Sequence, residues 1–129
     1  MKNERFGKEK RVRKQLEFDR VYKSNVYATD ATLVLMGVPN EFDYSRIGIV
    51  VSRKTGNAVQ RNYWKRVIRE AFRTQQSLIP TGFDFVVRPR KGAVCDPDHV
   101  RPSLRALSKR IAKRVDSLNQ SSKVKKREI

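Results

Sequence analysis

The spacing of apolar residues divides this chain into alternating helical and extended segments. In residues 15–23 the apolar positions recur at i, i+3 and i+4, which predicts a short helix. Three runs rich in β-branched residues, bounded by turn-forming residues, predict strands over residues 31–38, 46–52 and 83–88. A short helix therefore precedes two strands, and a third strand follows much later in the chain.

Two longer helices complete the predicted order. One covers residues 57–78, where Asn57 and Gln60 form a capping-box pair and Pro80 ends the pattern. The last helix has Asp98 as its predicted N-cap, and Pro102 limits its well-formed part to residues after about 101. The order helix, strand, strand, helix, strand, helix predicts an α+β fold with a single small sheet.

The length of 129 residues predicts one domain that buries its core without disulfides or metals. Residues 1–14 form a basic arm, which we expect to be irregular when free. The globular core is expected over residues 15–116. Residues 117–129 are polar and basic and are expected to be a disordered tail.

The long predicted helix has two incompatible faces. Its apolar side, which includes Trp64 and Ile68, needs a sheet or helix to cover it. The opposite arc, of about 140° at 100° per residue, is polar and basic. Glu70 is the only acid between Arg61 and Arg73, whereas charged helix surfaces usually mix signs, so a polyanion is favoured over a merely solvated face. The polar arc consists of Arg61, Asn62, Lys65, Arg66, Arg69 and Arg73.

The composition of the whole chain indicates the same partner. Thirty Lys and Arg residues oppose thirteen Asp and Glu residues, a net charge of +17, which is typical of proteins that bind phosphate backbones. A membrane surface is the main rival for such charge. The sequence contains no run of about 18 or more apolar residues, so no segment is expected to span a bilayer. The N-terminus lacks a secretory-type apolar segment, so a cytoplasmic location is expected.

Catalytic chemistry is weakly represented. Cys95 and His99 are the single residues of their types, too few for an ordinary zinc site. A nucleophilic Cys–His pair is conceivable, but no neighbouring group would orient it. The acids are scattered, and no glycine-rich phosphate loop precedes a helix. We therefore expect neither a small-molecule substrate nor catalysis by the protein alone.

Aromatic residues accompany the basic segments. Phe18 and Tyr22 lie one turn apart on the first predicted helix, and basic turns occupy residues 53–54 and 88–91. Where such segments border a groove, the rings could stack on unpaired bases, which is a common way of binding single strands. Packing of the same rings against the sheet is the alternative, and both interpretations stay open here.

One motif resembles a known family. The pattern R-N-x-x-K-R-x-x-R-E over residues 61–70, preceded by G-N-A-V at 56–59, resembles the signature of the bacterial ribonuclease P protein component. Residues 18–22 resemble the aromatic pattern of that family's first helix. Residues 48–54 and 84–87 resemble the strand that leads into the signature and the last strand. The resemblance covers about residues 8–115.

The resemblance implies a protein partner of a catalytic RNA that removes the 5′ leader of precursor tRNA. The RNA holds the required Mg²⁺, and the protein needs no cofactor of its own. The implied fold is the ribosomal protein S5 domain 2-like fold, with a mixed sheet and a left-handed strand–helix–strand crossover. By the same resemblance, Arg61, Asn62, Lys65, Arg66 and Arg69 face the RNA subunit, whereas Phe18, Tyr22, Arg53 and Lys54 line a leader cleft with Arg90 and Lys91 nearby.

Two departures and two rival classes qualify this interpretation. Relatives often carry an aromatic residue where this chain has Met36, and Arg88 and Pro89 alter the loop after the last strand. A basic ribosomal or nucleoid protein fits the composition equally well, but general phosphate binding does not require the signature spacing. A metal-dependent nuclease acting alone is disfavoured because the sequence has no acidic cluster.

Overall fold

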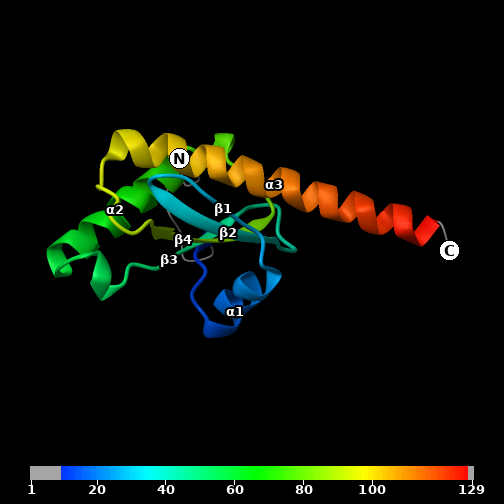
Figure 1. Cartoon of the computed structure of the whole chain (residues 1–129), viewed down its shortest axis with the longest axis horizontal. Coiled ribbons are helices and arrows are strands. Elements are labelled where there is room, and N and C mark those ends of the chain that lie inside the picture. Colours follow the sequence, from blue (N-terminus) through cyan, green and yellow to red (C-terminus); the bar gives the residue numbers. More distant parts are fainter. Residues whose placement is uncertain (1–9, 128–129) are drawn as a thin grey trace.

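The computed structural model describes the backbone of residues 10–127 and the side chains of residues 10–119. Within these residues, three α-helices pack on the two faces of one four-stranded sheet: α2 and α3 cover one face and α1 lies on the other (Figure 1). The elements are α1 (Gln15–Ser24), β1 (Tyr27–Thr29), β2 (Leu33–Pro39), β3 (Arg46–Ile49), the 3₁₀ turn η3 (Arg53–Thr55), α2 (Ala58–Thr74), the 3₁₀ turn η4 (Gln76–Leu78), β4 (Phe83–Pro89) and α3 (Pro97–Arg127).

The sheet is mixed and has the strand order β1-β2-β4-β3. The β1–β2 and β2–β4 pairs are antiparallel, whereas β3 and β4 are parallel and are connected through α2. A parallel pair needs such a crossover because a tight turn cannot reverse the chain direction twice. The α+β class and the strand–helix–strand unit are therefore confirmed; the hand of the crossover stays a prediction.

Strand alternation separates a buried face of the sheet from a partly open one. Leu33 and Leu35 of β2 point to the face under α2 and α3, where they are fully buried with Phe85 of β4. Trp64, on the apolar side of α2, is 4% exposed, as its helical position predicts. The other buried apolar side chains of the two covering helices are Val67, Ile68, Ala71, Phe72, Val100, Leu104, Leu107, Ile111 and Val115.

Strand β1 is absent from the order that the sequence predicts. It has three residues, too few for a period-2 pattern to be recognised. Asn25, in the left-handed conformation with φ 53°, ends α1 and turns the chain so that Tyr27 pairs with Met36 of β2. The first predicted strand is thus the second of the sheet.

The predicted start of the last helix is wrong. Helix α3 begins at Pro97, where a proline is tolerated because the first helical N–H needs no partner inside the helix. Asp96, and not Asp98, is the N-cap, since its Oδ1 accepts a hydrogen bond from the Asp98 N–H at 2.9 Å. Pro102 lies inside the helix at an exposed position, so the helical part of α3 begins earlier than predicted.

The predicted boundaries of the core also differ from the structure. Before α1, Arg11 forms a parallel bridge with Ile47 of β3, and Val12 is buried at 4% exposure, so part of the basic arm belongs to the fold. Residues 1–9 of that arm lie outside the described residues. At the other end, α3 continues to Arg127 through the predicted tail (Figure 1), because no glycine or proline follows Pro102 to end it.

A buried carboxylate connects α1 to the sheet. Asp84 of β4 is fully buried and accepts hydrogen bonds from Arg46 Nε at 2.8 Å and Arg46 Nη2 at 2.6 Å. Arg20 Nη1, on α1, donates to Asp84 at 3.0 Å, and Asn40 Nδ2 donates at 2.9 Å. Arg46 also donates through Nη1 to Glu17 of α1 at 2.7 Å. We call these five residues the Asp84 cluster.

Replacing the central acid should therefore destabilise the domain. Asp84→Ala leaves the guanidinium of Arg46, whose side chain is 14% exposed, without its main partner. We expect a loss of about 3–5 kcal/mol in the free energy of unfolding, measured by urea denaturation. Glu70→Ala, which breaks the exposed Glu70–Arg73 pair on α2, is the control and should change stability by about 1 kcal/mol or less. Equal losses from the two variants would contradict this role of the Asp84 cluster.

Candidate nucleic-acid interface

The start of α2 is fixed by a reciprocal cap. The Gln60 N–H donates to Asn57 Oδ1 at 2.9 Å, and the Asn57 N–H donates to Gln60 Oε1 at 2.9 Å, which confirms the predicted capping box. Gly56 precedes the cap with φ 156°, and a Cβ atom there would overlap the Gln60 side chain. The glycine and the cap thus set where the helix begins, directly after the exposed side chains of Arg53 and Lys54 on η3.

The outer face of α2 carries cations without compensating acids. Glu70 binds Arg73 through two hydrogen bonds of 2.7 and 3.0 Å, so its charge is already paired within α2. In the described part of the chain, no ion pair involves Arg61, Lys65, Arg66 or Arg69. Arg61 and Lys65 are half-buried, whereas Asn62, Arg66 and Arg69 are exposed. This face is therefore preorganised for a polyanion.

The two predicted aromatic residues of α1 have different surroundings. Phe18 is half-buried and lies on the backbone of β3: a Cβ atom added to Gly48 would be 2.8 Å from its ring atoms Cε1 and Cζ. Tyr22 is 43% exposed, and its ring centroid lies 6.5 Å from that of Phe18. Packing against the sheet is therefore confirmed for Phe18, whereas stacking of either ring on unpaired bases stays a prediction.

A cleft joins α1 to the cationic face of α2. It has a volume of about 200 Å³, its floor is formed by residues 47–49 of β3, and Phe18 lies beside Lys65 and Arg69 in its lining. Arg11 and Arg13 from the N-terminal segment line it as well. The structure thus brings one predicted leader residue together with two residues predicted to face the RNA subunit.

The remaining predicted leader residues lie elsewhere. Arg90 and Lys91 line a separate groove of about 420 Å³ on the open face of the sheet, next to Arg88. Arg53 and Lys54 line neither hollow. Arg11 and Arg13, which line the cleft, were not among the predicted site residues, because an irregular arm was expected over residues 1–14. Tyr27 and Thr29, which line the groove from β1, were not predicted either, because a strand of three residues gives no recognisable period-2 pattern.

The acids near α1 are already committed to arginines. Burial opposes ionisation of Glu17, but hydrogen bonds from the backbone of Lys14 and Arg13 and from Arg46 lower its pKa to about 2. Burial likewise opposes ionisation of Asp84, but Arg46, Asn40 and Arg20 hold its pKa below the usual range. Both carboxylates stay charged at neutral pH and neutralise arginines beneath α1. The basic side chains on the outer face of α2 are therefore available to a ligand.

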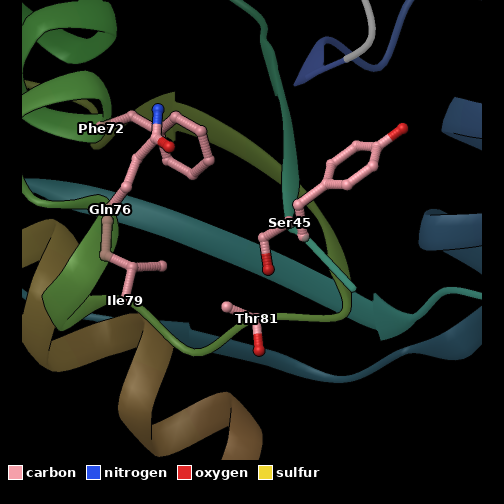
Figure 2. A pocket seen from close by; sticks show the side chains of 6 residues that line it. Ser45, Phe72, Gln76, Ile79 and Thr81 are labelled. Atoms are coloured by element: carbon pink, nitrogen blue, oxygen red, sulfur yellow. The ribbon is translucent and has the colours of Figure 1, made fainter. Parts of the chain in front are cut away.

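Figure 2 shows a further hollow, which is structural. Ser45, Phe72, Gln76, Ile79 and Thr81 point into a space of about 50 Å³, enough for a few water molecules but not for a nucleotide. The Ser45 hydroxyl in its wall donates to the Pro80 carbonyl oxygen at 2.6 Å and accepts from the Phe83 N–H at 3.0 Å. These bonds close the connection between η4 and β4.

Cys95 does not have the properties of a nucleophile. Burial and the neighbouring Asp96 carboxylate raise the pKa of its thiol to about 11, so it is protonated at neutral pH. Among the residues that the structure describes, no three His, Cys, Asp or Glu side chains gather as a metal site. The same residues contain no helix long and apolar enough to cross a bilayer.

Comparison with known proteins shows which family has this sequence and fold. Residues 6–112 match the family model described as Ribonuclease P. The chain belongs to the ribonuclease P protein family. A ribonuclease P protein component from Petrotoga mobilis is 44% identical over 91 residues, which are 70% of this chain and 77% of the relative. One from Idiomarina loihiensis is 37% identical over 120 residues, which are 91% of this chain and 95% of the relative.

Solved structures support the same assignment. The RNase P protein from Thermotoga maritima superposes with a TM-score of 0.72 at 41% identity, covering 78% of this chain and 96% of that one. The Staphylococcus aureus RNase P protein gives a TM-score of 0.70 at 37% identity, covering 81% and 95%. The four-stranded mixed sheet and its three helices are thus the fold of the family.

Proposed function

We propose that this chain is the protein component of ribonuclease P, which binds the catalytic RNA subunit and precursor tRNA in 5′ maturation of tRNA. The uncompensated cationic face of α2, in a chain that belongs to the ribonuclease P family, carries this proposal. A cytoplasmic location follows for the chain, since precursor tRNA is transcribed there.

The face of α2 is suited to a folded RNA. Arginine presents planar donors that bind phosphate oxygens in pairs, and a rigid helix holds several of them at fixed spacing. The capping box and the buried side chain of Trp64 keep this helix in one position on the sheet. The proposed contacts to the RNA subunit come from Arg61, Asn62, Lys65, Arg66 and Arg69.

The surface around α1 is suited to a single strand. Tyr22 offers an exposed ring, and the cleft beside Phe18 is lined by cations from two segments of the chain, the one before α1 and α2. Flat rings next to cations bind unpaired bases and their phosphates without requiring one sequence. We therefore propose that the 5′ leader lies along α1, with Arg53, Lys54, Arg90 and Lys91 contacting it farther from the ring pair.

Chemistry is assigned to the RNA subunit and the Mg²⁺ that it binds. Among the described residues, no acid lines the cleft, and the carboxylates of Glu17 and Asp84, which hold α1 on the sheet, are hydrogen-bonded to Arg46. The protein contributes positive charge among crowded phosphates, where it replaces part of the cation atmosphere.

Reconstitution tests this division of labour. The protein alone should not cleave precursor tRNA, and its addition to the cognate RNA subunit should lower the Mg²⁺ concentration required for cleavage, because protein cations substitute for some counterions. The measurement is initial rate against Mg²⁺ concentration, with and without protein. Cleavage by nuclease-free protein in the absence of RNA, or an unchanged Mg²⁺ requirement, would contradict the proposal.

Single cations of α2 should matter more than bulk charge. Arg61→Ala or Lys65→Ala should weaken binding to the RNA subunit by about 1–3 kcal/mol, as expected for charge-assisted contacts that lose water. Both variants should fold, since the substituted side chains lie opposite the apolar stripe. Lys109→Ala removes an exposed charge from α3 and is the control. Equal losses from α2 and α3 variants in a filter-binding titration would show that only total charge matters.

The ring of Tyr22 should act on the leader specifically. Tyr22→Ala should cost about 1–3 kcal/mol of holoenzyme affinity for precursor tRNA if it loses one stacked base, and nothing for mature tRNA, which has no leader. Phe18→Ala should show the same selectivity once its folding has been verified, because that ring also packs on β3. Tyr63→Ala on α2, 39% exposed, is the matched aromatic control. Losses of equal size on both tRNAs would make the α1 rings purely structural.

A further inference from the structure

The open face of the sheet carries an aromatic side chain that the proposal above does not use. Tyr27 of β1 is 48% exposed and lines the groove of about 420 Å³ that also contains Arg90 and Lys91. Given the proposed function, we infer that Tyr27 is a further stacking platform for a leader nucleotide. The basic side chains of this groove then bind the adjoining phosphates.

Strand register places Tyr27 in the groove. Tyr27 is paired with Met36 of β2, and Thr29 is paired with Val34, so these four side chains share one face of the sheet. Ala28 between them points to the opposite face and is buried. Met36 and Val34 are half-buried and provide an apolar floor beside the phenol ring. A base that stacks on Tyr27 would therefore lie against apolar surface and not in open water.

The walls of the groove are cationic. Arg88 is paired with Val34 in the β2–β4 register and is exposed on the same face, and Arg90 and Lys91 follow it on the loop. No acid contributes to the lining. The carboxylate of Asp30, which follows Thr29 in the chain, accepts hydrogen bonds from Ser103 Oγ at 2.6 Å and from two backbone N–H groups at 2.9 Å. An aromatic ring with three adjacent cations matches a nucleotide and its phosphates.

The edge strand that carries Tyr27 is held from outside. Arg114 Nη1, on α3, donates to the Tyr27 carbonyl oxygen at 2.7 Å, and Arg110 Nη1 donates to the Thr29 carbonyl oxygen at 3.3 Å. These bonds occupy backbone acceptors that would otherwise be open at the edge of the sheet. They also fix the backbone beneath the ring, and a platform that is already ordered loses less entropy on binding.

The position of α1 puts this groove and the proposed leader surface on the same face of the sheet. Gly48 and Met36 are both paired with Val86 of β4 and so share one face of the sheet, and the Phe18 ring of α1 packs on Gly48. Tyr22 and Tyr27 are separated by the turn at Asn25. A single strand leaving the α1 rings could therefore continue over β1 and β2, which favours leader RNA over an unrelated ligand.

Holoenzyme binding to precursor tRNA labelled with 2-aminopurine at successive leader positions tests the inference. Tyr27→Ala should weaken binding of leader-bearing tRNA by about 5-fold or more, leave mature tRNA unchanged, and abolish 2-aminopurine quenching at one position that Tyr22→Ala leaves quenched. Tyr27→Phe keeps the ring and should behave as wild type within about 2-fold. Val94→Ala, an exposed apolar residue outside the groove, is the control.

Failure of the inference is distinguishable from failure of the proposed function. If wild-type holoenzyme binds precursor and mature tRNA equally, the leader proposal itself fails and the inference fails with it. If the wild type discriminates but folded Tyr27→Ala discriminates equally well, only the inference is overturned. Loss of affinity in Tyr27→Phe as large as in Tyr27→Ala would also overturn it, because the hydroxyl and not the ring would then be responsible.

Discussion

The buried carboxylate of Asp84 is the constraint on which the position of α1 depends. It accepts four hydrogen bonds, from Arg46 on β3, Arg20 on α1 and Asn40 in the loop between β2 and β3. A charge without exposure is tolerated only when paired in this way. Because Arg46 also holds Glu17, the first and second turns of α1 are bound to the same two strands. If α1 shifted over the sheet, the Asp84 carboxylate would become exposed or would lose hydrogen-bond partners.

The cleft follows from that placement. With α1 fixed, the Phe18 ring rests on Gly48, the position where the sheet has no side chain to hold it away. The ring then borders the same hollow as Lys65 and Arg69 of α2. The two sides of the cleft meet because the parallel β3–β4 pair holds α2 on the other side of the same sheet. The arginines beneath α1 are paired with Glu17 and Asp84 and stabilise the fold. The cations on the outer face of α2 remain available to bind a ligand.

Features that depend on neighbours in the sequence could be predicted. The capping box of Asn57 and Gln60, the burial of Trp64 and the cationic arc of α2 all follow from local periodicity. The Asp84 cluster could not, because its members come from four distant segments and their pairing depends on the strand register. Tyr27 was missed for a related reason: its role depends on being opposite Met36 in a strand of three residues.

Predicted leader residues line two different hollows, and this division could not be predicted for the same physical reason. Phe18 and Arg90 can be assigned to one leader surface by resemblance, but which hollow each lines depends on where α1 covers the sheet and where it leaves the sheet open. Helix periodicity predicts the face on which a residue lies, whereas it carries no information on which other element that face meets.

A double-mutant cycle between Arg20 and Phe18 tests most directly whether the Asp84 cluster acts by placing α1. The quantity is the ratio of holoenzyme Kd values for mature and precursor tRNA, measured for wild type, Arg20→Ala, Phe18→Ala and the double variant, each verified as folded. If Arg20 acts only through the position of α1, its substitution lowers this ratio in the wild type but has no further effect once Phe18 is alanine, a coupling of about 0.5 kcal/mol or more. Strictly additive losses, or no loss from Arg20→Ala, would contradict the account.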